Sequence, residues 1–417
     1  YDGFHANKDN IYRLYRTIER NGDKPADIPL VAVTTYGLGP ALLNELPEVK
    51  NFVRTHDESS TVTYKPKGGE LKAFHENLIL AADSTFFDIF SFEAISGDLT
   101  KALDQPNSIV LTESTAAKYF GDKSPIGEQL SLAGGRIWGD FTVTAVMEDV
   151  PENSHFKFDM LVPMYNMLRA GQYLRDNGWG SNNFYNYVQL NPEADLSAAE
   201  EKVADFSARQ LDPQWKDYGI TIRLHLQPLK EIHLQTNVLV NVETVSRSSI
   251  YSLGVIAVFI LIIAWINYIN LSTARAMERA REVGIKKAIG VSRGGLIMQF
   301  FTESVLINFI AIVLAVVLTS VLLPKMGTMI DKDLQFASDD YRLWLILAGL
   351  FVFGTLASGV YPAFVLSSFK TVKALKGSSQ HAGKGISLRK ALVVFQFAAC
   401  LVLMAGTFAV YQQINYM

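Results

Sequence analysis

The sequence predicts an α+β domain followed by an α-helical membrane domain, because its two parts differ in charge and in apolar content. Residues 1–248 hold 34 acidic and 23 basic side chains, whereas residues 249–417 hold 7 acidic and 15 basic ones. The second part also carries nearly all of the long apolar runs, so the overall hydrophobic fraction of 49% averages two unlike regions. This pattern is typical of a membrane protein with a large water-soluble domain.

Residues 1–248 combine strand and helix patterns. Apolar or alternating runs bounded by Gly, Pro and Asn predict strands at residues 107–112, 140–150, 182–190 and 219–229. Between them, one helix is expected to begin at a Thr or Ser cap near residue 112 and to end at Gly121. A second is expected over residues 195–211, where Ser197 precedes Glu200 at the spacing of a capping box. The region is long enough to bury its own core, in one or two subdomains.

Four apolar stretches in the second part have the length of membrane spans. A bilayer core of about 30 Å needs roughly 20 apolar residues of helix. The stretches cover residues 249–271, 296–324, 343–366 and 391–410. Buried helices of a soluble core seldom continue so far without a charge, so we predict four transmembrane helices.

The charges of the connecting loops predict the orientation of these spans. Lys and Arg concentrate in the loops after the first and third spans, and Asp is abundant in the loop after the second. Because basic residues favour the cytoplasmic side of short loops, residues 1–248 are expected outside the membrane. No export signal is present in them and the sequence begins at Tyr1, so we expect that a preceding transmembrane helix is missing.

Motifs for common chemistries are missing from the sequence. It contains no phosphate-binding loop, no His-Glu-x-x-His and no Gly-x-Ser-x-Gly, which argues against nucleotide binding, zinc proteolysis and esterase activity. Its one cysteine, Cys400, allows no disulfide within the chain. His225 and His233 leave a metal pair open, although ordinary surface or half-buried histidines are the favoured interpretation. Basic residues are not interleaved with aromatic ones on one soluble face, so no nucleic acid is expected as a partner.

Among the polar residues within the predicted spans, three are candidates for a function in the membrane. Asn267 and Asn270 lie near the cytoplasmic end of the first span, and Glu303 lies about two turns into the second. Polar groups in a membrane suggest a substrate or proton pathway. Hydrogen bonding between neighbouring helices, or a position near the interface, is the favoured alternative.

The sequence resembles a known family in both parts. Residues 266–308, "INYINLSTARAMERAREVGIKKAIGVSRGGLIMQFFTESVLIN", closely resemble the FtsX-like permease domain, and residues 358–377 and 388–403 are similar to its later helices. Residues 86–130 and 141–161, and the opening stretch "FHANKDNIYRLYR", look like a MacB-type periplasmic core domain.

The resemblance implies a permease subunit of a MacB-type, or type VII, ABC transporter in the bacterial inner membrane, with residues 1–248 in the periplasm. It is similar to Bacteroidetes-type permeases in which two such halves are in tandem. The FtsX-like domain would then cover residues 249–375, with residues 376–390 as a cytoplasmic linker. Residues 391–417 would open a second half that is truncated here.

The same resemblance implies that a separate cytoplasmic ABC ATPase, working as a dimer, supplies ATP hydrolysis and holds the ATP and magnesium. The chain itself would then be no enzyme and would bind no cofactor. The loop expected to dock on this ATPase comprises Arg279, Arg281, Glu282, Val283, Gly284, Ile285, Lys286, Lys287 and Gly290. Val283 and Ile285 are expected to be apolar anchors, and the glycines, with Gly294 and Gly295, to be places where the chain bends. Alternatively, these charges only set the topology.

The implied activity is export of a periplasmic or membrane-borne substrate by mechanical coupling. A periplasmic adaptor or outer-membrane channel, a second permease half and membrane lipids would be the further partners. Two alternatives remain open: an FtsX-like complex that regulates an envelope enzyme, and a complex that releases lipoproteins.

Overall fold

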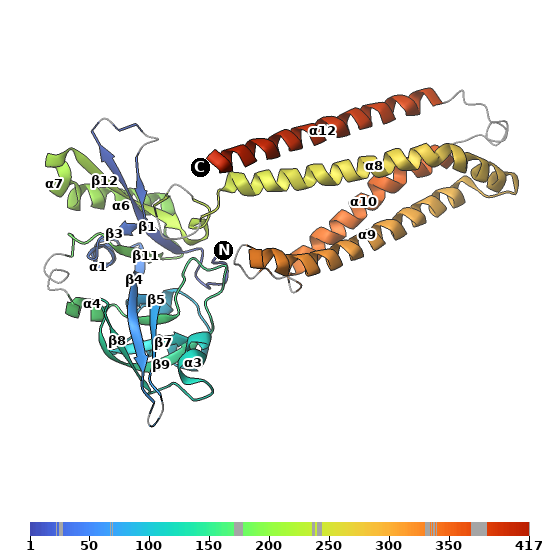
Figure 1. Cartoon of the computed structure of the whole chain (residues 1–417). Helices are drawn as coiled ribbons and strands as arrows, with labels where there is room; N and C mark the ends of the chain where they lie inside the picture. Colours follow the sequence, from blue (N-terminus) through green and yellow to red (C-terminus); the bar gives the residue numbers. More distant parts are fainter. Residues whose placement is uncertain are drawn as a thin grey trace. The chain divides into compact units, whose positions relative to one another are not determined.

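The computed structural model describes most of the chain as two compact units (Figure 1). The residues outside this description are 22, 25–27, 67, 69, 171–177, 236–237, 240–243, 330–333, 335, 337, 339, 368–381 and 417. The units are Tyr1–Ile250 and Tyr251–Met417, which divide the chain close to the change in composition at residue 248. The prediction of an α+β domain followed by a helical membrane domain is confirmed.

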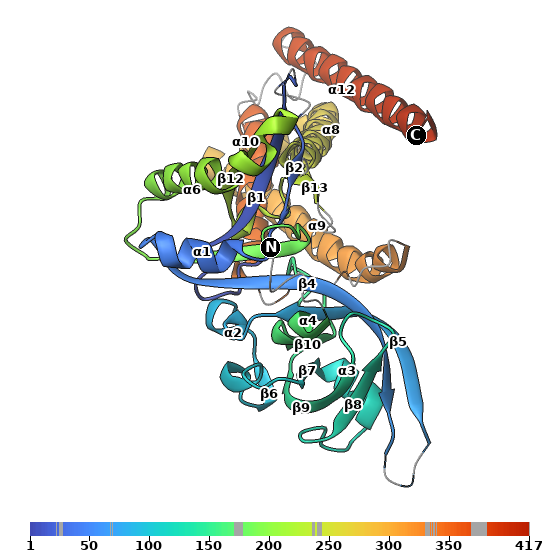
Figure 2. The same cartoon turned by 90° about the vertical axis from the view of Figure 1, so that its left-hand side faces the viewer.

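The described strands of the first unit form one mixed sheet. They are β1 Ile11–Arg20, β2 Leu30–Val31, β3 Val33–Thr34, β4 Val49–Tyr64, β5 Lys72–Ala82, β6 Ala94–Gly97, β7 Ser108–Thr112, β8 Gln129–Ala133, β9 Gly139–Met147, β10 Met160–Pro163, β11 Phe184–Leu190, β12 Ile220–Pro228 and β13 Val238–Leu239. The order is β13-β2-β1-β11-β4-β5-β10-β7-β9-β6, while β12 pairs with β1, β3 with β11, and β8 with both β4 and β9. Figure 2 shows how the long strand β4 runs from the part of the sheet near β1 to the part near β8.

Four strands and two helices were expected in this unit from the sequence, and all six are present. The strands are β7, β9, β11 and β12, each within one or two residues of its predicted start. The helices are α3 (Glu113–Phe120), which ends at Gly121, and α6 (Leu196–Gln210). The predicted capping box of α6 is wrong: the cap is Asp195, whose carboxylate accepts a hydrogen bond from the Ser197 amide. Asp is among the strongest caps, so the helix begins one residue before the expected Ser.

The other helical segments of this unit are short and lie on the sheet. They are α1 Leu38–Glu45, α2 Phe86–Ile89, α4 Tyr165–Ala170 and α7 Asp212–Trp215, with 3-10 turns η2 Leu99–Lys101, η3 Lys216–Tyr218 and η4 Leu229–Glu231. Helix α6 packs on β12, α1 on β4 and β11, and α3 on β7 and β9. Ala199, Val203 and Phe206 form the buried stripe of α6 at helical spacing, which explains its position.

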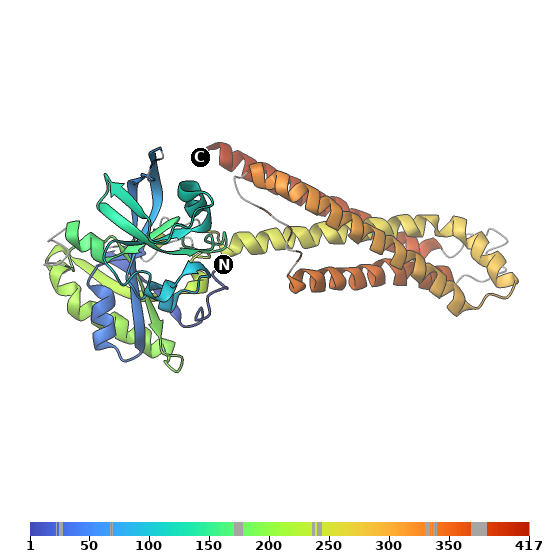
Figure 3. The ribbon, with the colours of Figure 1, turned by 90° about the horizontal axis from the view of Figure 1, so that it is seen from below.

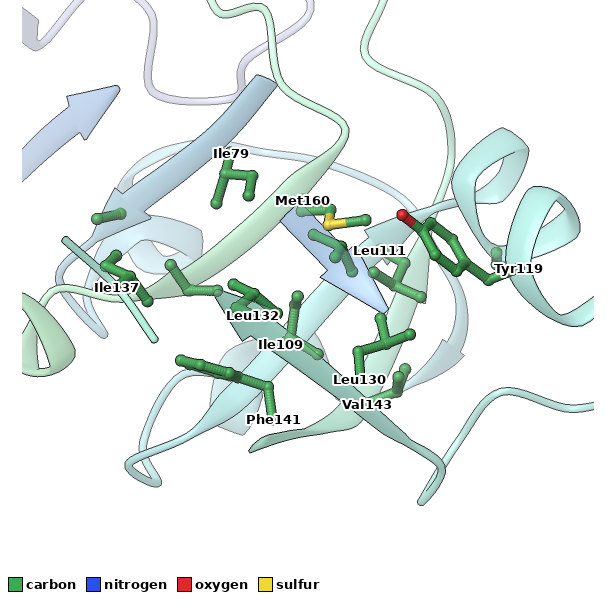
Figure 4. Close-up of a cluster of buried hydrophobic side chains, with 14 of the residues drawn as sticks. Ile79, Ile109, Leu111, Tyr119, Leu130, Leu132, Ile137, Phe141, Val143 and Met160 are labelled. Atoms are coloured by element: carbon green, nitrogen blue, oxygen red, sulfur yellow. The ribbon is translucent and has the colours of Figure 1, made fainter. Parts of the chain in front are cut away.

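The core of the first unit forms three apolar clusters. One lies between β4, β5 and β7–β10 under α3, and Figure 4 shows its side chains, including Ile109, Phe141 and Met160, pointing toward one another. A second, rich in phenylalanine, surrounds α2. A third joins β1, β11 and β12 to α1 and α6. Strand β7 lies between β10 and β9 and is buried along its whole length, which is why its sequence is largely apolar instead of alternating.

The second unit consists of long helices (Figure 3). They are α8 Arg247–Ala288, α9 Arg293–Met329, α10 Tyr341–Ser367 and α12 Ala382–Tyr416, and α8 begins at the end of the first unit. Among the described residues, three stretches are long and apolar enough to cross a membrane: Arg247–Tyr268, Arg293–Thr328 and Lys390–Gln413. The third predicted span coincides with α10, whose apolar part at Tyr341–Leu356 is shorter by the same criterion.

Candidate functional site

The segment predicted to couple the chain to a partner forms a tight hairpin between α8 and α9. Helix α8 ends in a Schellman motif, in which the Val291 amide donates to the Lys286 carbonyl and the Gly290 amide donates to the Lys287 carbonyl. Gly290 has φ +97°, a conformation that glycine adopts without strain. Ser292 then caps α9, because its hydroxyl accepts a hydrogen bond from the Gly295 amide. Both helix ends are therefore satisfied within the connection itself.

A small apolar core closes this hairpin. Val283 packs against Leu296 and Phe300, with Ile297 at the edge, and only 1% of Val283 is exposed. The Lys286 ammonium donates to Glu282 on its own helix and to Gln299 on α9, at 2.7 and 3.0 Å. These contacts between α8 and α9 make the hairpin a defined structural element.

The outer face of the hairpin is apolar and basic. Ile285 lies in the last turn of α8 and Ile289 directly follows the helix, and they are 55% and 76% exposed. Lys286 and Lys287 lie between them in sequence, and Arg293 begins α9. Exposed isoleucines beside positive charges are suited to contact an apolar partner surface with an acidic rim.

Several predictions for this segment need correction. Val283 is not an exposed anchor, because its side chain forms the hairpin core. Gly284 does not bend the chain, since it lies inside α8, and Gly294 and Gly295 lie in the first turn of α9. Gly290 alone of these glycines occupies the turn with positive φ. Arg279 and Arg281 lie on α8, but their side chains are outside the described ones. The coupling role of the segment stays a prediction.

The intramembrane polar residues lie in different environments. Asn270 is buried on α8, Asn267 is exposed, and Glu303 is half-buried on α9. A close approach of three helices, which the sequence did not predict, occurs where Gly354 of α10 faces Asn308 of α9 and Trp265 of α8. A Cβ atom at Gly354 would lie 3.0 Å from the Asn308 Oδ1 and 3.2 Å from the Trp265 Nε1. The role of Asn267, Asn270 and Glu303 stays a prediction.

The sequence also gave no sign of a buried polar cluster in the first unit. The Asp2 carboxylate accepts hydrogen bonds from the backbone amide and the Nδ1 of His155, at 3.0 and 2.9 Å. The Nε2 of His233 lies 3.5 Å from the other carboxylate oxygen, and the Nε2 of His5 lies 4.0 Å from the first. The hydroxyl of Tyr187 donates to the remaining nitrogen of His155.

Burial and hydrogen bonding shift the titration of this cluster, which we name the Asp2 cluster (Asp2, His5, His155, His233 and Tyr187). Burial raises the pKa of the Asp2 carboxyl, but the hydrogen bonds from His155 and His233 outweigh it and hold that pKa well below its usual range. Burial lowers the pKa of His5 to about 4 and also lowers that of His155, against the opposing charge of Asp2. At neutral pH these two imidazoles are therefore uncharged.

No group of three or more potential ligands among the described residues is placed to hold a metal ion. His225 and His233, the pair considered from the sequence, have different neighbours. His225 stacks on Tyr15 and hydrogen-bonds with the Thr17 hydroxyl, while His233 belongs to the Asp2 cluster.

Comparison with known families decides what these two units are. The family described as MacB-like periplasmic core domain matches residues 2–206, and the family described as FtsX-like permease C-terminal matches residues 254–371. The chain belongs to the MacB/FtsX-like ABC transporter permeases. It is an inner-membrane protein with a periplasmic core domain, as the resemblance implied.

The similar curated proteins match this permease over part of their own length. They include the uncharacterized ABC transporter permease YknZ of Bacillus subtilis (strain 168), 25% identical over 48% of this chain and 45% of that protein. The macrolide export ATP-binding/permease protein MacB of Acinetobacter baylyi is 24% identical over 74% of this chain and 41% of its own. The pyoverdine export ATP-binding/permease protein PvdT of Pseudomonas syringae pv. syringae is 25% identical over 67% and 39%, respectively. The chain thus spans less than half the length of these relatives.

Proposed function

We propose that this permease couples ATP hydrolysis in a cytoplasmic ATPase to movement of its periplasmic unit, and so exports a periplasmic or membrane-borne substrate. The names of two relatives, which describe macrolide and pyoverdine export, support export as the kind of activity. The chain is a multi-pass protein in this proposal, with the α8–α9 hairpin in the cytoplasm. It is no enzyme itself, and a partner ATPase dimer holds the ATP and magnesium.

The observation that carries the proposal is the continuity of α8. This helix has 42 residues and begins at Arg247, within the periplasmic unit, and it ends at Ala288 in the hairpin. At 1.5 Å per residue it is about 63 Å long, roughly twice the thickness of a bilayer core. Arg247 is joined to Glu231 of the periplasmic unit by an ion pair of 2.9 Å. A push on the hairpin can therefore be transmitted along one helix.

The hairpin provides the surface on which the ATPase docks. Ile285 and Ile289 bury against an apolar patch of the partner, and the surrounding Lys and Arg side chains pair with acidic groups at its rim. The core of Val283, Leu296 and Phe300 fixes the angle between α8 and α9. A periplasmic adaptor, an outer-membrane channel and a second permease half complete the assembly in this proposal.

Substitution of the exposed isoleucines tests the docking. The double variant Ile285→Asp/Ile289→Asp, reconstituted in lipid nanodiscs with the ATPase that copurifies with the wild-type chain, is expected to lose stimulation of ATP hydrolysis. Met326→Asp is the matched control, because Met326 is 57% exposed near the other end of α9. Normal stimulation by the double variant would contradict docking on the hairpin.

A further inference from the structure

The Asp2 cluster joins two segments of the periplasmic unit that are far apart in sequence. The N-terminal segment, Tyr1–Ala6, contributes Asp2 and His5, and the Tyr1 ring stacks on the His233 ring with centroids 3.9 Å apart. His233 begins the stretch that leads into α8, and its carbonyl accepts a hydrogen bond from the Val245 amide at 2.8 Å. The N-terminal segment thus contacts His233, which is hydrogen-bonded to the residue two positions before α8.

A metal site is the first interpretation of one carboxylate beside three imidazoles, but the hydrogen bonds oppose it. Both ring nitrogens of His155 are used, one by Asp2 and the other by the Tyr187 hydroxyl. The Nδ1 of His5 accepts a hydrogen bond from the Ser91 amide at 3.1 Å. These three ring nitrogens are engaged in hydrogen bonds within the protein and are not available to a metal ion.

The bond between His5 and Ser91 differs from the others in its response to a proton. A backbone amide can only donate, so the Nδ1 of His5 must be its unprotonated acceptor. Protonation converts this nitrogen into a donor and sets two donors against each other. The bond between His155 and Tyr187 tolerates the same change, because the hydroxyl can turn and accept. His5 is therefore the residue whose protonation breaks a contact.

We propose that His5 is a pH-sensitive tie that holds the N-terminal segment against Ser91 and His233 at neutral pH and releases it on acidification. At neutral pH the cluster already holds the charge of the Asp2 carboxylate, beside the guanidinium of Arg13, which lies buried between Tyr187 and Gln227. A proton on His5 adds a buried charge and also removes the acceptor of the Ser91 amide. The other titratable groups that face the cluster are Tyr185, Tyr187 and Asp57, together with His155 and His233.

The direction of the effect follows from linkage. The pKa of His5 is about 4 with the tie closed, and we take the ordinary value of 6.5 for the open form. The open form therefore binds a proton more readily than the closed form. Closure is therefore fully favoured above pH 6.5 and is lost progressively as the pH falls toward 4. These two values give an increase of about 20-fold in the open-to-closed ratio between pH 7 and pH 5.

Hydrogen exchange of the full chain in nanodiscs tests the tie. With rates corrected for the intrinsic pH dependence of exchange, the amides of Ser91 and Val245 are expected to lose about 20-fold protection between pH 7 and pH 5. The amides of β7 are the internal reference. His5→Asn keeps an acceptor at the δ position that cannot be protonated, so its Ser91 protection is expected to stay constant. His5→Ala removes the acceptor and is expected to be open at both pH values.

Three results would overturn the tie. They are constant Ser91 protection in the wild type, loss of protection in His5→Asn equal to that in the wild type, and release of Ser91 without Val245. If the β7 amides show that His5→Asn does not fold, the wild-type titration decides instead. Loss of protection outside the range of pH 6.5 to 4 would then refute the assignment to His5.

Discussion

Replacement of Val283 by Asp should open the α8–α9 hairpin. The side chain is 1% exposed and packs on Leu296 and Phe300, and burial of a valine contributes roughly 1.5–3 kcal/mol. An ionised carboxylate in the same place would cost several kcal/mol more, so the variant opens to water instead. An expected loss of about 2–3 kcal/mol raises the open population roughly 30- to 150-fold, since each 1.4 kcal/mol is a factor of ten.

Limited trypsin digestion in detergent micelles measures this opening. Lys286, Lys287 and Arg293 are cleavage sites in or beside the hairpin, and cleavage of a helix requires local unfolding. We expect at least a 30-fold faster cleavage for Val283→Asp. The control Ile285→Asp changes an exposed position and should stay within about twofold of the wild type. Cleavage of Val283→Asp at the wild-type rate, or equally fast cleavage of the control, would refute the assignment of a hairpin core.

Two further substitutions test contacts in the two units. Arg54→Met should destabilise the periplasmic unit by about 3–5 kcal/mol in thermal unfolding, because it leaves the Asp83 carboxylate without the guanidinium that now binds it at 2.7 and 2.9 Å. If Arg54→Met melted at the temperature of the wild type, water would be solvating the Asp83 carboxylate in place of the guanidinium. Gly354→Val should lower the aggregation temperature in detergent, at a cost of about 1–3 kcal/mol, since its Cβ meets Asn308 and Trp265 at 3.0 and 3.2 Å. Gly349→Val, where nothing lies within 4 Å, is the matched control, and equal effects would exclude close packing as the cause.

The sequence predicted those strands whose burial follows a simple apolar pattern. Strand β7 is five buried residues in a row, and β12 alternates toward α6. Strand β4 was not predicted, although it is the longest of the described strands. Its middle contains Arg54, His56 and Glu58, which are buried because Arg54 pairs with Asp83, and His56 lies 3.2 Å from Glu58. When polar residues are buried because they pair with other side chains, the strand that carries them does not show an apolar or alternating sequence pattern.

The composition of the α8–α9 hairpin predicted a basic helical segment, but it did not predict which side chains of that segment are buried. Val283 and Ile285 are two apolar residues in one basic stretch, and the sequence treats them alike. In a helix, two positions apart means about 200° around the axis, so one side chain faces α9 and the other faces away. Which of them is buried depends on which face of α8 contacts Leu296 and Phe300 of α9. This contact belongs to the tertiary structure and cannot be seen in the sequence. Because of it, Ile285 and not Val283 is the residue to substitute in a docking experiment.

The Asp2 cluster could not be predicted because none of its spacings is local. Asp2 precedes β1, His155 precedes β10 and His233 follows β12, so the order of these strands in the sheet brings them together. In the register of β1 with β11 and β12, Arg13 lies between Tyr187 and Gln227, and its charge balances the Asp2 carboxylate. A motif search examines short spacings, whereas this network depends on the order of the strands. It follows that a substitution at His5 should change the hydrogen-exchange protection of the Val245 amide, more than two hundred residues away in sequence. The strands between them should keep their protection.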